Sequence, residues 1–434
     1  MVRNESSKNA WSRQHQGNDF VSARCKKTHA IKTKMTKNKH KENLDKTRLK
    51  LTSFVTFLVG FSQAVLIYVM SSYFKLATGT ESVGIFYAVA YTIFLITLLN
   101  LHKLVRLWGK SNVFYFSLLA KILVLIFLIF NDPSKLSVLL LMLYMILGNI
   151  EWVAMDVIVE SFSVDKLSGR IRGLYLTIIN AGFLFGPFVA AYILGKMDFY
   201  GIFVFSLIFN CFVFVFALIC FRNINHKFEQ KLKVFDVIKK VVARKNILRI
   251  YYISFVLEFF YALMIIYMPI YLRDLGYSWE NIGWIFTAML MPFVLVQYPM
   301  GILADKKTGE KEFLIFSIII MAISTIAIYF IGTGTVFIWV LVLFATRVGA
   351  ALIEILRDSY FFKKIDATDV DVINFFRTSL PVAYIAATTL SSFVLFFLPI
   401  KFAFILTGLV VLSALYPAFK LTDNKSEKEF LVGI

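Results

Sequence analysis

The sequence has little of the chemistry that enzymes use. Its 434 residues include three cysteines and five histidines. Cys211 and Cys220 lie in one apolar stretch, no CxxC pair occurs, and every histidine lies outside the long apolar stretches. A metal centre or a histidine-dependent membrane hydrolase would need such side chains in or beside those stretches. The GxxxxGK(S/T) phosphate loop is also missing. We therefore expect no enzyme, no metal, no cofactor and no ATP hydrolysis by this chain.

Charged residues are scarce too, at 17%, whereas hydrophobic residues make up 59% and the mean hydropathy is +0.74. Apolar runs of about 20 residues recur, and each is long enough to cross about 30 Å of hydrocarbon. Backbone groups in lipid must bond to one another, so these runs predict helices rather than the shorter alternating strands of a barrel. We place twelve spans, at residues 51–74, 83–101, 113–130, 136–159, 171–195, 200–221, 250–272, 281–303, 313–332, 335–357, 372–397 and 401–420.

The two halves of the sequence repeat one pattern at a constant offset of 198 residues. Residues 156–162 (Asp-Val-Ile-Val-Glu-Ser-Phe) and 354–360 (Glu-Ile-Leu-Arg-Asp-Ser-Tyr) each hold an acid, a second acid four residues later, then serine and an aromatic residue. The same offset relates spans one and seven, through Phe57 and Phe255, Phe61 and Phe259, Ala64 and Ala262, Met70 and Met268, and Tyr73 and Tyr271. Duplicated membrane bundles most often carry something across the bilayer.

Basic residues predict the orientation. The first 50 residues carry 14 Lys/Arg against 4 Asp/Glu, and residues 222–249 carry nine against two. The loops on the opposite side are short and nearly uncharged. The excess of positive charge in cytoplasmic segments then places both termini and residues 222–249 in the cytoplasm. Basic charge can also indicate nucleic-acid binding, but here it adjoins the spans, so we expect no nucleic-acid partner.

The predicted fold is an all-α membrane protein with twelve transmembrane helices in two pseudo-symmetric six-helix bundles. Its parts are a basic disordered cytoplasmic tail (1–48), the N-terminal bundle (49–221), a basic cytoplasmic linker (222–249), the C-terminal bundle (250–420) and a second cytoplasmic tail (421–434). The first tail has no apolar stretch and is not a secretory signal; it is either a tail attracted to anionic lipid or a lead-in before a start at Met35. We expect a monomer in the cell membrane, with both termini inside.

Ionisable residues inside the spans are concentrated in every third helix. Glu151 and Asp156 lie in the fourth span, Glu258 in the seventh, and Arg347 and Glu354 in the tenth. Such groups are costly in lipid and usually face a cavity or a partner. Helical spacing places Arg347, Glu354 and Asp358 on one face, and Asn149, Asp156 and Glu160 repeat that face at the same offset. Lys121, in the third span, is expected to snorkel to the cytoplasmic end.

A loop between the eighth and ninth spans provides a family resemblance. Residues 301–311, Gly-Ile-Leu-Ala-Asp-Lys-Lys-Thr-Gly-Glu-Lys, resemble the loop signature Gly-x-Leu-Ala-Asp-Arg-x-Gly-Arg-Lys of the major facilitator superfamily, with Lys306 for Arg and one extra residue before Gly309. The equivalent first-half loop keeps Gly109 and Lys110 but has Arg106 where Asp is expected. The resemblance covers about residues 50–420. It implies two six-helix bundles, with helices 1, 4, 7 and 10 lining a central cavity.

The fifth span resembles the helix-5 pattern that is commonest in drug/proton antiporters of this family. Gly173, Gly182 and Gly186-Pro187 keep the pattern, and Ala190-Ala191 replace its closing Gly-Gly. Residues 182, 186 and 190 form a ridge of small side chains that allows a second helix to approach closely. Pro187 should bend the helix. Ordinary tight packing explains the same pattern without an antiporter.

Several residues are candidates for a gate. Gly301, Asp305, Lys306 and Gly309 are expected, by the resemblance, to lock the cytoplasmic side. Glu160 and Asp358 lie at helix ends on that side and are expected to join an inter-helix ion-pair lock. Direct substrate binding by these charges is the alternative.

The remaining candidates concern protons and substrate. Glu258 has no charged neighbour on its own helix, so burial should favour its proton-carrying form. Asp156, Glu151 and Glu354 are further candidates, and Arg347 could pair with Glu354. Aromatic residues around Glu258 suit an apolar or cationic compound. Gln63, Asn180 and Gln297 are plausible polar members of the pocket.

These features predict a secondary transporter that works by alternating access, with proton-coupled efflux of a small organic compound as the first interpretation. Uptake of a metabolite and an uncoupled facilitator are the alternatives within the same class. A non-transporting scaffold or a lipid scramblase is the alternative from another class, and the buried acids argue against it, because an inert scaffold gains nothing from them.

Overall fold

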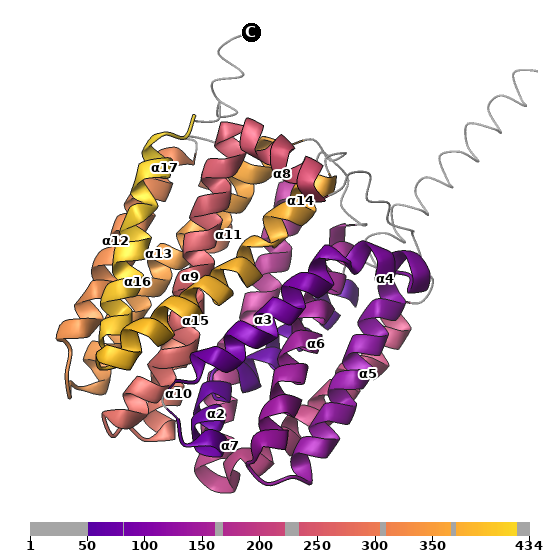
Figure 1. Ribbon diagram of the computed structural model, residues 1–434, viewed down its shortest axis with the longest axis vertical. Coiled ribbons are helices and arrows are strands. Elements are labelled where there is room, and N and C mark those ends of the chain that lie inside the picture. The colour runs from indigo at the N-terminus through magenta and orange to yellow at the C-terminus, as the bar shows by residue number, and fades with distance from the viewer. Residues whose placement is uncertain are drawn as a thin grey trace, which may run out of the picture. The chain divides into compact units, whose positions relative to one another are not determined.

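The computed structural model of the chain describes residues 51–80, 82–160, 168–221, 234–303, 310–365 and 370–422. Asp305, Lys306 and Gly309 of the predicted gate lie outside the described residues. The described residues from Thr52 onward belong to one compact unit. Every regular element in the described ranges is a helix (Figure 1).

The helices follow one another along the chain in two sets. The first set is a helix over residues 51–67, α2 (Met70–Thr78), α3 (Gly84–Leu99), α4 (Leu101–Trp108), α5 (Lys110–Ile129), α6 (Lys135–Glu160) and α7 (Ser168–Cys220). The second set is α8 (Val234–Ala243), α9 (Lys245–Asp274), α10 (Trp279–Leu295), α11 (Gln297–Leu303), α12 (Lys311–Ala327), the 3-10 turn Ile328–Phe330, α13 (Val336–Lys363), α14 (Val370–Arg377), α15 (Ser379–Phe397), α16 (Phe402–Ser413) and α17 (Leu415–Phe419).

The helices are long and apolar enough to cross a membrane. Within the described ranges, nine have the length and composition of a span, and α3 and α10 are shorter apolar helices. α7 changes direction at Asp198, whose φ of 53° is left-handed, so this long element contains two spans. With α7 counted as two and the shorter pair added, the arrangement is consistent with the twelve predicted spans.

Some boundaries differ from the sequence prediction. The predicted linker 222–249 contains α8, and α9 begins at Lys245 rather than at residue 250. The predicted span 281–303 is divided at Val296 into α10 and α11. Pro299 then lies in the first turn of α11, where its missing N–H costs least. The start of the eleventh span is likewise a separate short helix, α14.

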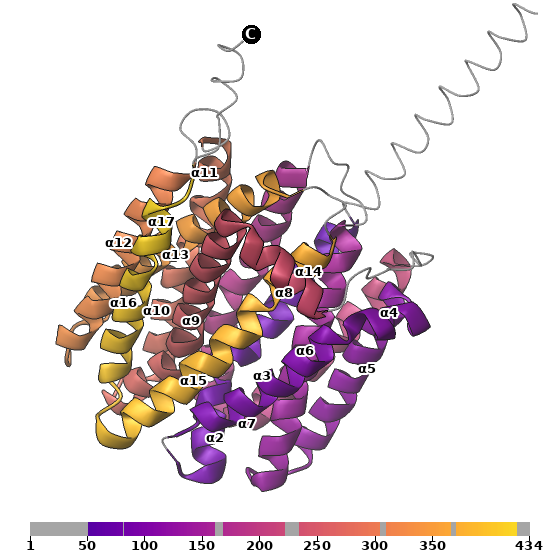
Figure 2. The ribbon, with the colours of Figure 1, turned by 45° about the horizontal axis from the view of Figure 1, so that its top comes forward.

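Helices from the two halves meet in two equivalent pairs. α7 packs against α10, and α3 packs against α15; the second pair lies side by side in both views (Figures 1 and 2). The offset of 198 residues carries α3 onto α10, and the first part of α7 onto α14 and α15. The internal repeat therefore maps the contact between α3 and α15 onto the contact between α10 and α7, as expected for a duplicated bundle.

Small residues of the fifth span allow the closest helix approaches. A Cβ atom on Gly182 would lie 2.4 Å from the carbonyl oxygen of Phe57, and one on Gly186 would lie 2.2 Å from Cβ of Ala64. On another face of α7, Ala191 meets Gly283 of α10, where an added Cβ would lie 2.4 Å from the alanine methyl. The predicted ridge therefore packs on the first helix of its own half, and α10 of the other half packs nearby.

Candidate functional site

Lys121 and Glu151 form an ion pair in the interior of the first half. Their Nζ and Oε2 atoms lie 2.5 Å apart, and the two side chains are 0% and 1% exposed. The Lys121 ammonium also lies 5.1 Å from the ring centre of Tyr144. The expectation that Lys121 snorkels is wrong. Its ammonium stays buried, because the buried carboxylate of Glu151 on α6 compensates its charge. Glu151 is thereby neutralised by a partner from α5.

Glu258 also has a cationic partner, contributed by α13. The Nη1 atom of Arg357 lies 3.0 Å from Oε1 of Glu258 and donates to Ser254 at 2.7 Å. Asp358 lies 3.4 Å from the same guanidinium. The prediction of an isolated acid at position 258 is wrong, since its neighbour comes from another helix rather than from its own. A carboxylate already paired in this way is no longer the natural anchor for a cationic compound.

Asp156 joins the two halves of the molecule. Its Oδ2 atom lies 2.8 Å from Nη2 and 3.0 Å from Nε of Arg377, in α14. Arg377 also donates to Asn374 at 3.1 Å. A planar guanidinium that donates through two nitrogens holds one carboxylate in a defined direction. This ion pair therefore links α6 of the first half to the start of the eleventh span.

Glu354 reaches across the halves through amides instead of a cation. The Gln297 amide nitrogen donates to Glu354 at 2.7 Å, and the amide oxygen of the same Gln297 accepts from Asn180 at 3.1 Å. Gln297 is buried, at 1% exposed. No cation pairs with Glu354 among the described residues. Of the four acids predicted inside the spans, it alone in the described structure lacks an ion pair.

Asp156 and Glu354 are the same position in the two repeats. The offset of 198 residues relates them, and it brings Arg377 next to Asn180, at position 179. The acid on the fourth helix of the first half contacts the fifth helix of the second half directly, whereas Glu354 is connected to the fifth helix of the first half through Gln297. One contact is a direct ion pair, and the other passes through the side-chain amides of Gln297 and Asn180.

Arg347 is a buried cation whose partners are aromatic. It is 1% exposed, and its guanidinium lies 5.0 Å from the ring centre of Phe260 and 5.5 Å from that of Tyr261. Its Nε and Nη1 atoms have no hydrogen-bond partner in the described structure. The predicted pair with Glu354 does not form, because seven residues separate the two by about 10 Å along the helix.

Comparison with protein families matches this architecture. The model of the Major Facilitator Superfamily matches residues 52–353 and 280–432. The chain belongs to the Major Facilitator Superfamily. The comparison with curated proteins found no match. The protein is therefore a membrane transporter of this superfamily, with a multi-pass helical fold and a small-molecule substrate.

The family's loop signature lies largely outside the described residues, but its flank has a defined contact. Glu310 accepts from Lys363 at 2.6 Å and from Ser359 at 2.9 Å, which ties the start of α12 to the end of α13. Gly301, Glu160 and Gly173 lie in described helices. Asp358 is buried, and its Oδ1 atom lies 3.4 Å from Nε of Arg357.

The sequence did not indicate the ion pair at the opposite end of the spans. Nζ of Lys75 lies 2.8 Å from Oδ1 of Asp274, at the ends of α2 and α9. Both residues lie at span ends, where charges are common, so no signal distinguished them. Arg377 was missed as well, although an arginine five residues inside a predicted span was a usable signal. Gln63, by contrast, donates to the carbonyl of Gly148 within its own half, at 3.0 Å.

Proposed function

We propose that this transporter exchanges protons for a small organic compound and drives the efflux of that compound from the cell. The observation that carries the proposal is the state of Glu354, an acid inside a span that is bonded to an amide and has no cationic partner among the described residues. An acid inside a span that is not held in an ion pair can take up and release a proton during transport. Each of the other three acids lies in an ion pair: Glu151 with Lys121, Asp156 with Arg377, and Glu258 with Arg357.

The hydrogen bonds from Asn180 to Gln297 and from Gln297 to Glu354 can link protonation of Glu354 to movement of the helices. A carboxylate accepts a strong hydrogen bond from Gln297, and protonation weakens that bond by removing the charge. Gln297 also contacts Asn180 of the first half, so the protonation state of Glu354 changes the contact between α11 and α7. Alternating access requires such a contact to differ between the two end states. The direction of transport rests on the resemblance of the fifth span to antiporters.

Neutralising Glu354 should uncouple transport from the proton gradient. Glu354→Gln keeps the hydrogen-bonding capacity but removes the titratable group, so proton-driven accumulation should be lost while downhill exchange continues. The substrate is first found by thermal-shift screening of the purified protein against a compound library. Substrate flux and internal pH are then followed together in proteoliposomes with an imposed pH gradient.

Glu258→Gln is the matched control for this variant. It removes an acid that is already paired, so it should lower thermal stability by removing one of the two carboxylates beside Arg357, rather than abolish coupling selectively. Wild-type flux that ignores the gradient, or a Glu354→Gln protein that still concentrates substrate, would rule out proton antiport through this residue.

The proposed orientation is tested separately. In a background without the native cysteines, cysteine at position 225 or 424 should react with an impermeant maleimide only after the cytoplasmic side is exposed. Cysteine at position 333, in the short loop before α13, should react from the outside. External labelling of Asn225→Cys or Asn424→Cys would contradict the positive-inside assignment. External labelling of only one of the two would also contradict an even number of spans between them.

A further inference from the structure

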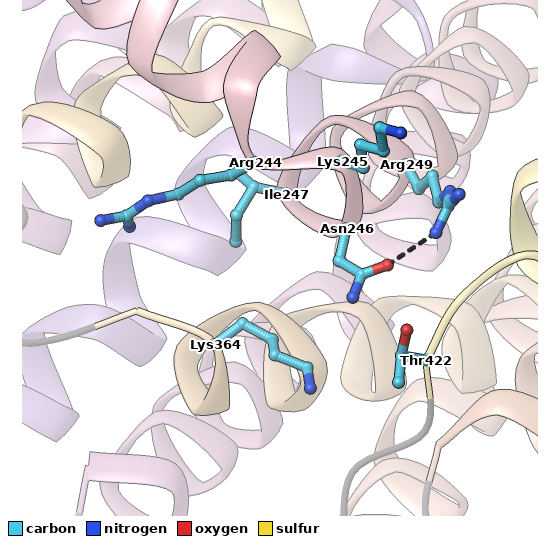
Figure 3. Close-up of a pocket in the computed structure, with 7 residues that line it drawn as sticks. All are labelled: Arg244, Lys245, Asn246, Ile247, Arg249, Lys364 and Thr422. Atoms are coloured by element: carbon cyan, nitrogen blue, oxygen red, sulfur yellow. Dashed lines mark hydrogen bonds between the residues drawn. The ribbon is translucent and has the colours of Figure 1, made fainter.

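A basic pocket lies where three segments of the second half meet. α9 begins there, α13 ends there, and the chain emerges there from α17. The pocket has a volume of about 410 Å³. Seven residues line it: Arg244, Lys245, Asn246, Ile247, Arg249, Lys364 and Thr422 (Figure 3). Four are cations and none is an acid, so the lining favours an anion.

The Arg249 guanidinium, the Thr422 backbone and the Lys364 amine surround the opening. Arg249 donates through Nη1 to Asn246 at 2.8 Å and to the carbonyl of Lys420 at 2.5 Å, and these bonds hold its guanidinium in place. The hydroxyl of Tyr360 donates to the carbonyl of Thr422 at 2.7 Å, which fixes the opposite wall. Figure 3 shows the amine of Lys364 extending from the end of α13 toward Asn246 and Thr422. Arg244 extends away from this group in the same view.

An exposed apolar surface continues from the pocket along the same helices. Leu248 and Tyr252 of α9 are exposed, and so are Tyr416 and Phe419 of α17. α9 and α17 are in contact, and the hydroxyls of Tyr252 and Ser413 lie 2.8 Å apart. Apolar and aromatic side chains just below a ring of cations are suited to acyl chains hanging below a charged headgroup.

We propose that this pocket binds the phosphate group of an anionic lipid in the cytoplasmic leaflet. Lysine and arginine clusters beside spans attract anionic headgroups, and the arginine fork matches phosphate oxygens. The exposed apolar surface favours a lipid phosphate over a free one. The lipid would bridge the start of α9 and the ends of α13 and α17, and it would therefore stabilise the second half. This site is independent of the proposed proton exchange.

The test uses the full chain, purified and placed in nanodiscs. Thermal melting and native mass spectrometry are measured in phosphatidylcholine, with phosphatidic acid or phosphatidylglycerol added, and separately with inorganic phosphate. Anionic lipid should remain bound and raise the melting temperature of the wild-type protein. Arg249→Gln with Lys364→Gln should weaken that binding about 30-fold, the combined effect of two basic residues at an anionic surface.

The matched control removes the same charge elsewhere. Lys135→Gln with Lys401→Gln alters two cations at the other end of the spans, and should leave lipid binding as in the wild-type protein. Melting in phosphatidylcholine alone checks that each variant folds. If the double variant does not fold, Lys364→Gln alone replaces it, because this substitution breaks none of the bonds that hold Arg249. Equal losses in control and pocket variants, or equal binding of inorganic phosphate and lipid, would overturn the proposal.

Discussion

Replacing Gly186 with valine should prevent the first half of the protein from packing. A Cβ atom at this position would lie 2.2 Å from Cβ of Ala64 and 2.7 Å from its carbonyl carbon, so the obstacle includes backbone as well as side chain. The first helix cannot retreat independently, because Gly182 contacts it one turn away, with an added Cβ 2.4 Å from the Phe57 carbonyl oxygen. We expect a destabilisation of about 3 kcal/mol or more, at the upper end of overpacking effects.

Gly195→Val is the matched control, since it lies in the same helix and an added Cβ would have nothing within 4 Å. Both variants carry the same helix-propensity change, so their difference isolates the contact with the first helix. The yield of monodisperse protein and its melting temperature in detergent measure the effect. Equal melting of the two variants would show that the approach of the helices is not the reason for glycine at position 186.

The second large effect is expected at the buried pair Lys121–Glu151. Glu151→Gln removes one charge and leaves the other enclosed, with Lys121 0% exposed. Breaking a buried ion pair from one side costs about 3–5 kcal/mol, so the variant should melt at a much lower temperature or fail to accumulate. Replacing both residues, by Lys121→Met and Glu151→Leu, should recover most of that stability, because no uncompensated charge then remains.

The pair Lys75–Asp274 provides the comparison for this cycle. Its side chains are 29% and 43% exposed, so water compensates either charge alone. Lys75→Met should therefore cost only about 0–1 kcal/mol. If Lys75→Met and Glu151→Gln have the same effect, or the double replacement at 121 and 151 is no more stable than Glu151→Gln, burial is not what makes the inner pair important.

The sequence was informative wherever one helix alone decides the outcome. Apolar runs predicted the spans, and the 198-residue offset predicted the duplication. The spacing of Gly182 and Gly186 predicted a ridge of small residues that does contact another helix. The turn at Asp198 falls inside the loop expected between the fifth and sixth spans. Each of these features depends on local pattern, which periodicity describes directly.

Partners across the bundle could not be predicted in the same way. The family resemblance placed the helix of Glu258 beside the central cavity, but the rotation and depth of α13 decide that Arg357 meets it. The same reason explains why Lys121 finds Glu151, and why Arg347 meets aromatic rings rather than Glu354. A periodic pattern gives the face of one helix and not the register between two, so ion pairing needs the packed structure.

The ion pairs Lys75–Asp274 and Asp156–Arg377, which both join the two halves, should respond differently to dissolved salt. Lys75–Asp274 is partly exposed, whereas the side chains of Asp156 and Arg377 are about a tenth exposed. Mobile ions screen surface charges strongly and enclosed charges weakly. Rising ionic strength should therefore weaken the Lys75–Asp274 pair more than the Asp156–Arg377 pair. A change in salt concentration alone would then loosen one connection between the two halves and leave the other in place.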